Sequence, residues 1–157
     1  MAEKLKLTRV PMSKQAPEIR SRNPDEVASG YTYEQAVEEA KRCIQCKKPG
    51  CVPNCPVNID IPAFVEAVAE GNLPKAAGII YATNSLPAIC GRVCPQEEQC
   101  QKPCLAGLAH KDINCSIAIG QLEAFLADWE RQHLETLQAL YNGVRQDFWS
   151  EGGFAPF

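Results

Sequence analysis

The sequence predicts a mainly α-helical, bundle-like domain whose helices are joined by long loops. Apolar residues recur at steps of three and four in four segments of the chain, and no segment reads convincingly as a strand. Twelve prolines and ten glycines indicate that much of the remaining chain lies in loops. Eight of the nine cysteines fall in two loop-like stretches, 43–55 and 90–104. We interpret the helices as a scaffold for these cysteines.

The size and charge of the chain exclude several classes of protein. Its 157 residues suit one domain with extensions. The net charge of −3 gives no reason to expect the basic face that nucleic-acid binding needs. No apolar run approaches the roughly 18 residues of a membrane span, and residues 1–15 lack the apolar core of a secretory signal. We therefore expect a cytoplasmic protein with no nucleic-acid partner and no membrane span.

The first half of the chain shows an arm followed by a helix. Residues 1–24 have no periodic apolar pattern, and we predict an extended N-terminal arm. Thr32 and Gln35 fit a capping box, in which a hydroxyl and an amide satisfy each other's free backbone donors. The helix that begins there runs towards Cys43 and delivers this cysteine at its C-terminal end.

Two further helices and a short turn separate the cysteine blocks. Asp60 is the predicted N-cap of a helix that stops at Gly71. A helix is predicted over 73–83, with proline in its first turn. Residues 85–87 resemble another capped start, which leads a short turn into Cys90.

The last predicted helix is long and amphipathic. From about Ser116 its apolar residues recur at helical spacing, namely Ile119, Leu122, Leu126, Trp129, Leu137, Leu140 and Val144. The pattern admits a break near His133. We assign residues 131–157 to a C-terminal helix extension with an aromatic tail.

The cysteines indicate a metal site. A disulfide framework is disfavoured by the odd number of cysteines and by the absence of a secretory signal. In a reducing compartment, clustered thiols bind metal, and Cys43 and Cys46 are spaced so that both sulfurs reach one centre. A structural zinc site stays an alternative, although it would want two C-x2-C pairs and the second block has spacings of three, five and three residues.

The first block is similar to an iron–sulfur motif. Its spacings are two, four and three residues, and Pro56 directly follows Cys55. Bacterial two-cluster ferredoxins use C-x2-C-x2-C-x3-C-P, in which the fourth cysteine binds the other cluster. The ending matches and the middle spacing is longer. The pattern favours an iron–sulfur cluster, and less strongly a second one.

Taken together, the motifs resemble a known family. The C-x2-C-x4-C-x3-C-P stretch, then PAICGRVCP with C-x5-C-x3-C behind it, then IAIGQLEAF, is similar to the N-terminal iron–sulfur domain of the glutamate synthase small subunit. Dihydropyrimidine dehydrogenase and NADH-dependent ferredoxin:NADP oxidoreductase carry the same module. The resemblance covers roughly residues 25–130. It implies an α-helical ferredoxin-like domain that holds two interleaved [4Fe–4S] clusters and passes electrons between flavins.

The resemblance also implies a ligand set. One cluster would be held by cysteines of both blocks, Cys43, Cys46, Cys51 and Cys104. The other would be held by Cys55, Cys94, Cys100 and Glu123. Glu123 borders the apolar face of its helix, so without the resemblance it reads as a partly exposed glutamate. Cys90 and Cys115 are left over, and Cys90 is an alternative ligand because three residues separate it from Cys94.

The sequence lacks the parts that would make this module an enzyme on its own. No glycine-rich dinucleotide motif follows a strand, and no nucleophile–base pair is evident. We expect FAD and NAD(P) only on a partner chain or domain, and we expect this chain to relay electrons to a flavoprotein partner. The arm and the C-terminal helix and tail would be docking surfaces, with aromatic anchors at Trp129, Phe148, Trp149, Phe154 and Phe157.

Overall fold

The computed structural model describes residues 7–150 and the side chains of residues 7–145. The side chains of Phe148 and Trp149, and the whole of Phe154 and Phe157, lie outside this described part. Its helices, in chain order, are α1 (Pro17–Arg20), α2 (Tyr33–Ala40), α3 (Ile61–Ala69), α4 (Leu73–Tyr81), α5 (Pro87–Val93), α6 (Leu105–His110), the short 3₁₀ helix η1 (Ile113–Cys115) and α7 (Ile119–Ser150). An isolated bridge between Lys14 and Ala28 is the only extended pairing described among residues 7–150. The predicted mainly α-helical class is confirmed.

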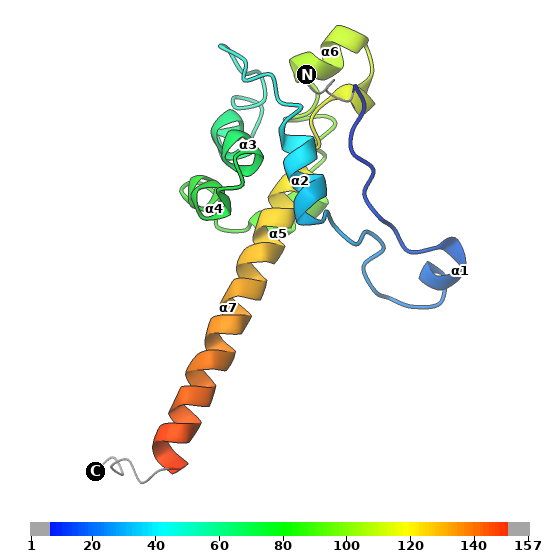
Figure 1. The fold of residues 1–157 in the computed structure, drawn as a ribbon. Helices are drawn as coiled ribbons and strands as arrows, with labels where there is room; N and C mark the ends of the chain where they lie inside the picture. The colour runs from blue at the N-terminus through cyan, green and yellow to red at the C-terminus, as the bar shows by residue number, and fades with distance from the viewer. Residues whose placement is uncertain (1–6, 151–157) are drawn as a thin grey trace, which may run out of the picture. The chain divides into compact units, whose positions relative to one another are not determined.

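The chain divides into two compact units, Met1–Ala127 and Asp128–Phe157. The first unit contains every helix up to α6 and the first turns of α7 (Figure 1). Both cysteine blocks belong to it. Within residues 7–150, no helix has the length and apolar character needed to cross a membrane.

The helix starts in the first unit follow from local capping. The capping box of α2 is present as predicted, because Gln35 N donates to the Thr32 hydroxyl while the Gln35 side chain accepts from Thr32 N. Asp60 caps α3 as predicted, accepting from Ala63 N at 3.3 Å. The stop after α3 is also as expected, because Gly71 adopts the left-handed φ of +75° that glycine tolerates best.

Two details of the predicted helices are wrong. No side chain of residues 85–87 caps α5; instead Asn84 Oδ1 accepts from the N–H of Leu86 at 2.9 Å. The α7 helix also continues through His133 without a break. His133 stacks on Trp129 one turn earlier, with ring centroids 5.6 Å apart, so it supports the helix instead of ending it.

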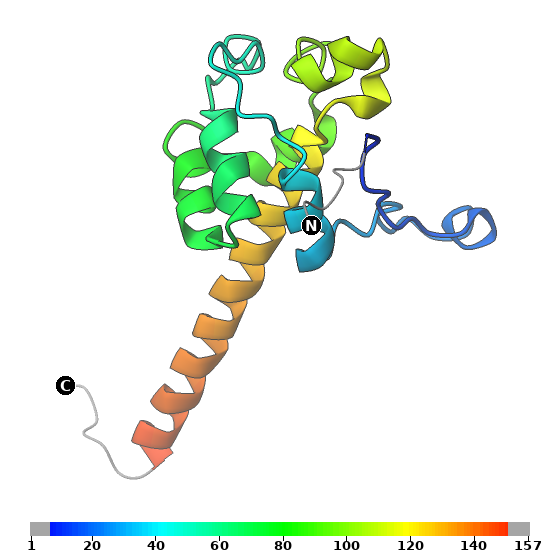
Figure 2. The same ribbon diagram turned by 45° about the horizontal axis from the view of Figure 1, so that its top comes forward.

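The core of the first unit lies between α2, α3, α4 and the start of α7. The helix α3 packs against both α2 and α4, and the three helices lie side by side in the two ribbon views (Figures 1 and 2). Its largest fully buried apolar side chains come from α3, α4 and α7: Phe64, Val65, Val68, Ile80, Leu122 and Leu126. Side chains of this kind contribute about 1.5–3 kcal/mol each when fully buried.

A buried ion pair joins α2 to two other parts of the unit. Glu39 and Arg42 contact each other at 2.5 Å, with side chains 0 % and 3 % exposed. The Glu39 carboxylate also accepts from the backbone N–H of Val10 at 2.7 Å and of Ala118 at 2.9 Å. Arg42 donates to the carbonyl of Cys115 at 2.7 Å. The pair therefore fastens the N-terminal arm and the segment before α7 to the end of α2.

Arg9 strengthens the attachment of the N-terminal arm. Its guanidinium donates to Gln101 Oε1 and to the carbonyl of Ile113, both at 2.7 Å, and to the carbonyl of Ser116 at 3.1 Å. Val10 beside it is buried. Part of the predicted arm is thus packed against the second cysteine block, and the arm includes the short helix α1.

In the second unit, the described side chains from 131 to 145 are all exposed. Leu134, Leu137, Tyr141 and Val144 are each more than half exposed and follow one another at steps of three, four and three. This spacing is that of a helix face which meets a partner helix. The face has no apolar partner among the described residues of its own unit.

We predict that Glu39→Ala destabilises the protein by about 3–5 kcal/mol, because it leaves the Arg42 charge buried and unpaired. The control is Glu98→Ala, which breaks the exposed pair with Lys102 and should cost less than about 1 kcal/mol. Chemical denaturation measures both values. A Glu39→Ala cost as small as that of the control would contradict the role of the pair.

Candidate metal centres

The first cysteine block leaves the end of α2 in a tight turn. Cys43 N donates to the carbonyl of Ala40, which closes the last turn of the helix. Gln45 then adopts a left-handed φ of +48°, and its side chain donates to the carbonyl of Pro62 at 3.1 Å. The turn thus directs Cys43 and Cys46, on either side of Gln45, to one pocket.

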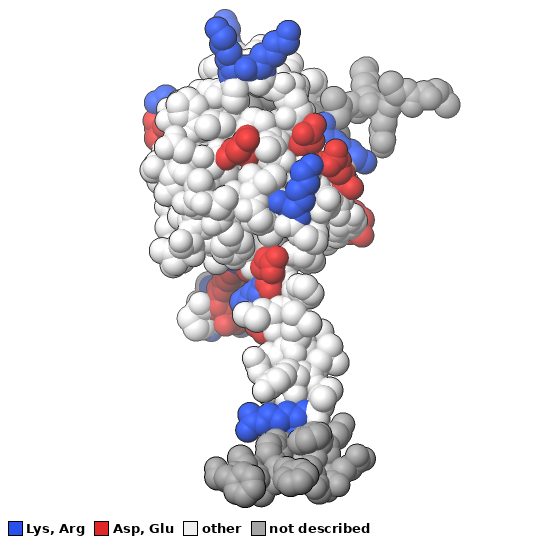
Figure 3. Space-filling model, turned by 90° about the vertical axis from the view of Figure 1, so that its left-hand side faces the viewer, with Lys and Arg blue, Asp and Glu red and all other residues white. Residues whose placement is uncertain are grey.

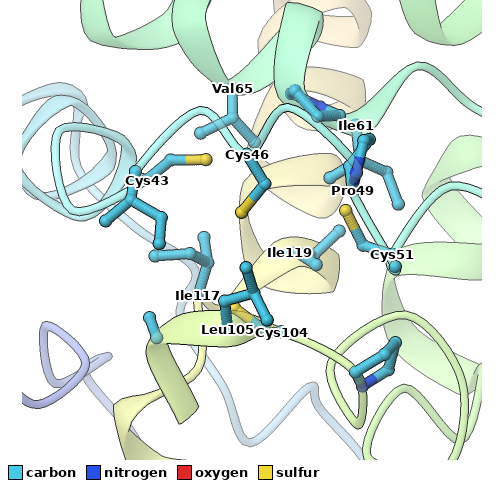
Figure 4. A pocket seen from close by; sticks show the side chains of 15 residues that line it. Cys43, Cys46, Pro49, Cys51, Ile61, Val65, Cys104, Leu105, Ile117 and Ile119 are labelled. Atoms are coloured by element: carbon cyan, nitrogen blue, oxygen red, sulfur yellow. The ribbon is translucent and has the colours of Figure 1, made fainter. Parts of the chain in front are cut away.

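Four of the predicted ligands surround that pocket. Cys43, Cys46 and Cys51 come from the first block, and Cys104 comes from the second block at the start of α6. Figure 4 shows the sulfurs of the first three directed towards the middle of the pocket, with Cys104 facing them. The hollow, including its part open to solvent, has a volume of about 430 Å³.

Apolar side chains form the inner wall of this pocket. They come from α3 and from the start of α7, and include Ile61, Val65, Ile117 and Ile119. All four are buried. Because this wall is apolar, the four cysteine thiols are the lining groups that can bind a metal.

A close contact between glycine and proline brings the two blocks together. A Cβ atom on Gly50 would lie 2.8 Å from the Cβ of Pro103 and 3.2 Å from its carbonyl oxygen. Gly50 precedes Cys51, and Pro103 precedes Cys104. Only a residue without a side chain allows the two cysteines to reach one pocket in this way.

Burial and crowding raise the pKa values of the thiols in the first group. The pKa of Cys51 rises to about 11, chiefly through burial and then through the neighbouring Cys43 and Cys104. Burial likewise raises the pKa of Cys43, with smaller effects from Cys104 and Cys46. These electrostatic effects agree with the position of the thiols around one pocket. Metal binding must displace their protons.

We define the other four predicted ligands, Cys55, Cys94, Cys100 and Glu123, as a second candidate group, because their charges act on one another. Burial, and after it the nearby Cys55 and Glu123, raise the pKa of Cys100 to about 12. Burial also raises the pKa of Cys94, followed by Cys90, Glu123 and Cys55. Cys55 belongs to the first block and Cys94 and Cys100 to the second, so this group too is built from both blocks.

The helix α5 carries Cys94 to the carboxylate of Glu123. A Cβ atom on Gly91 would meet the backbone N of Ala124 at 2.7 Å and the carbonyl of Gly120 at 2.8 Å. The backbone of α5 therefore lies directly on the first turns of α7. Glu123 stands in those turns and is 7 % exposed.

Glu123 is a buried carboxylate with a single strong hydrogen bond described. Asn84 Nδ2 donates to its Oε1 at 2.7 Å. Burial raises the pKa of Glu123 to about 7, and the hydrogen bond from Asn84 opposes that rise. A buried carboxylate of this kind is costly unless it is paired or binds a metal.

The two remaining cysteines have different surroundings. Cys90 is half-buried, and its sulfur lies 3.7 Å from Asn84 Oδ1 and close to Cys94. Cys115 is buried in η1, where its carbonyl accepts from Arg42. Cys90 is thus near the second group, whereas Cys115 does not line the pocket of the first group.

Sequence reasoning missed Asn84 and Gly91. The sequence predicts the cap of α5 within residues 85–87, whereas the side chain that accepts from the backbone there belongs to Asn84, one residue earlier. Gly91 follows Cys90 and carries no signal of its own, because its partner backbone in α7 is about 30 residues away in sequence.

The fold and both groups define a class of protein. Two loops rich in cysteine, carried on a helical scaffold, bring thiolate donors together in the chemistry that iron–sulfur clusters require. The four thiols that line the pocket of the first group are donors of the type that such a cluster takes.

Comparison with known proteins supports this class. Residues 20–135 match the family described as dihydropyrimidine dehydrogenase domain II, 4Fe-4S cluster. The chain belongs to this family of iron–sulfur domains. The predicted resemblance is therefore confirmed, as is binding of a [4Fe–4S] cluster as the family's property.

Individual relatives are subunits or parts of oxidoreductases. The chain is 37 % identical to the glutamate synthase [NADPH] small chain of Halomonas elongata over 69 % of its own length and 22 % of that protein. It is 35 % identical to the NAD-dependent dihydropyrimidine dehydrogenase subunit PreT of Escherichia coli K12, over 69 % of its length and 25 % of that protein. A putative oxidoreductase of the same strain, AegA, is 35 % identical over 85 % of this chain and 18 % of its own length. The chain thus spans about a quarter or less of the relatives it matches.

We predict that Gly50→Ala separates the two cysteine blocks, because the added Cβ would overlap Pro103. Overpacking of this kind costs about 1–3 kcal/mol. The control is Gly78→Ala in α4, where an added Cβ meets nothing within 4 Å and should stabilise the helix by about 0.5–1 kcal/mol. Thermal unfolding and iron content after anaerobic reconstitution measure the effects. Equal iron content and stability in the two variants would show that the contact does not matter.

Proposed function

We propose that the chain binds two [4Fe–4S] clusters and relays electrons within a larger NAD(P)H-dependent oxidoreductase of the glutamate synthase small-subunit type. The observation that carries this proposal is the meeting of the two cysteine blocks. Each group of candidate ligands contains residues from both blocks. Interleaved ligands would hold two clusters close together, as a relay requires.

The ligand assignment follows the two groups. The first cluster would be held by Cys43, Cys46, Cys51 and Cys104, which surround one pocket. The second would be held by Cys55, Cys94, Cys100 and Glu123, whose charges influence one another. A bound [4Fe–4S] cluster supplies one-electron transfer.

The surrounding residues would tune and protect this chemistry. The apolar wall from α3 and the start of α7 excludes water from the inner side of the first pocket. A dry, low-dielectric wall and the number of ligand charges are the protein's means of setting a cluster's reduction potential. The carboxylate of Glu123 would give the second cluster a harder ligand than the first, and therefore a different potential.

A zinc module is the alternative function. Zinc needs four ligands at about 2.0–2.3 Å from one ion. Within residues 7–150, no three Cys, His, Asp or Glu side chains converge closely enough to hold a single ion. The thiols of the first group line one pocket, and the C-x2-C-x4-C-x3-C-P spacing of the first block favours a cluster over one ion.

The partner would be a flavoprotein chain or domain that carries FAD and NAD(P). The matched relatives are about four or more times longer than the shared segment, and two of them are named for NADPH- or NAD-dependent activity. Figure 3 shows basic side chains at the end of the first unit where the cysteine loop lies, beside a surface with few charges. Lys47 and Lys48 in that loop are exposed.

The exposed face of α7 would be a second docking surface. Leu137→Asp, in the middle of that face, should weaken association with the flavoprotein, whereas Gln138→Asp beside it should not. Affinity purification of the tagged full chain from its source compares the two. A wild-type chain that elutes as a monomer without flavin would contradict the partner proposal.

The metal content tests the proposed function directly. We predict about eight irons and eight sulfides in each anaerobically purified or reconstituted chain. The protein should be brown, and its visible absorption should bleach when dithionite reduces it. A colourless chain with stoichiometric zinc would establish the alternative.

We predict that Cys104→Ala lowers the iron content from about eight to about four atoms per chain, because it removes the ligand that the second block contributes to the first cluster. Cys115→Ala is the control and should retain about eight, since Cys115 lies away from that pocket. Iron analysis with circular dichroism to confirm folding measures both. Retention of eight irons by Cys104→Ala would refute the assignment.

A further inference from the structure

Asn84 uses both ends of its side-chain amide in the segment between α4 and α5. Its Nδ2 donates to Glu123 Oε1 at 2.7 Å, and its Oδ1 accepts from the N–H of Leu86 at 2.9 Å. The same oxygen lies 3.7 Å from the sulfur of Cys90. Asn84 is only 4 % exposed, so water does not compete for these contacts.

The contact with Glu123 is not needed to start α5. The oxygen of the amide already satisfies the backbone at the start of that helix, and the nitrogen is left for another purpose. Asn72 provides a comparison within the chain. It caps α4 with its oxygen, accepting from Lys75 N at 3.2 Å, but it is exposed. Capping therefore explains the oxygen of Asn84 but does not explain why its nitrogen is buried against a carboxylate.

The hydrogen bond fixes the Glu123 side chain. A glutamate has three rotatable side-chain bonds, and ordering such a chain costs conformational entropy. A short buried hydrogen bond from Asn84 Nδ2 offsets that cost and selects one position of the carboxylate. It engages one carboxylate oxygen and leaves the other available beside Cys94 and Cys100, whose pKa values the Glu123 charge raises.

The same amide also contacts the rival ligand. The thiol of Cys90 lies near Cys94 and is placed to donate to Asn84 Oδ1. The contact holds the Cys90 sulfur on the Asn84 side chain. One residue thus contacts both side chains that could complete the second group.

We propose that Asn84 is the positioning residue of the second cluster, holding Glu123 in place as its fourth ligand in preference to Cys90. The inference rests on the proposed function, since it presumes that the second group binds a cluster. It extends that function by naming the residue that selects a carboxylate. Residues that orient a metal ligand typically change metal affinity by about 10–100-fold when they are replaced.

The test compares Asn84→Asp with Asn72→Asp in the full, reconstituted chain. Both variants keep the oxygen that accepts from the backbone and replace the amide nitrogen by an oxygen. Only Asn84→Asp removes a donor to Glu123. Potentiometric titration followed by electron paramagnetic resonance reports each cluster separately, and a chelator that traps Fe²⁺ reports the rate of iron loss.

We expect Asn84→Asp to release the irons of one cluster about 10–100-fold faster than wild type and to shift the potential and signal of that cluster alone. Asn72→Asp should match wild type.

Unchanged potentials and iron release in Asn84→Asp would overturn the proposal, as would equal shifts of both clusters. If Asn84→Asp does not fold, Asn84→Ala against Asn72→Ala makes the same comparison without an added charge. The wild-type iron content distinguishes failure of the proposed function from failure of the proposed role of Asn84. About four irons in wild type would refute the second cluster itself, whereas eight irons with an unaffected variant would refute only the role of Asn84.

Discussion

The buried pair of Glu39 and Arg42 is the interaction on which the arrangement of the cysteine blocks depends. The pair lies at the end of α2, just before the first block begins. Its hydrogen-bond partners include the carbonyl of Cys115 and the N–H of Ala118, at the two ends of the segment that leads into α7. Taking two charges out of water is expensive, and several short hydrogen bonds to backbone groups offset the cost here. Because those bonds come from the arm, from α2 and from the entry to α7, the pair fixes the flanks of both metal groups at one place. Glu123, the candidate ligand from α7, lies in the first turns of the helix that this attachment positions.

Both candidate centres depend on the two cysteine blocks crossing each other. Each group combines residues from both blocks, so neither centre would form if the blocks were separated. The close contact of Gly50 with Pro103 permits the crossing. A second close contact, of Gly91 with the backbone of α7, brings α5 against the helix that carries Glu123. Metal binding would add its own stabilisation, because a site of this kind rarely exists in the unfolded chain.

Local signals made the helices predictable, and long-range contacts made much of the site unpredictable. The capping box at Thr32 and the cap at Asp60 are encoded within four residues, and the structure confirms both. The spacing of the cysteines indicated the type of metal, and the structure brings the predicted ligands into two groups. By contrast, the bond between Asn84 and Glu123 spans 39 residues and that between Glu39 and Ala118 spans 79. Such contacts depend on how the helices pack against one another, and neither capping motifs nor apolar periodicity predicts this packing. The continuity of α7 was missed for a related reason, since His133 gains its support from Trp129.

Magnetic coupling between the two clusters is the most direct test of the central claim, that interleaved ligands from two blocks hold two [4Fe–4S] clusters side by side. Electron paramagnetic resonance of the fully reduced, anaerobically reconstituted chain measures it. The account predicts a signal that integrates to about two spins per chain and is broadened or split by interaction between neighbouring reduced clusters. A sharp signal that integrates to about one spin, unchanged when Cys94 is replaced by alanine, would contradict it.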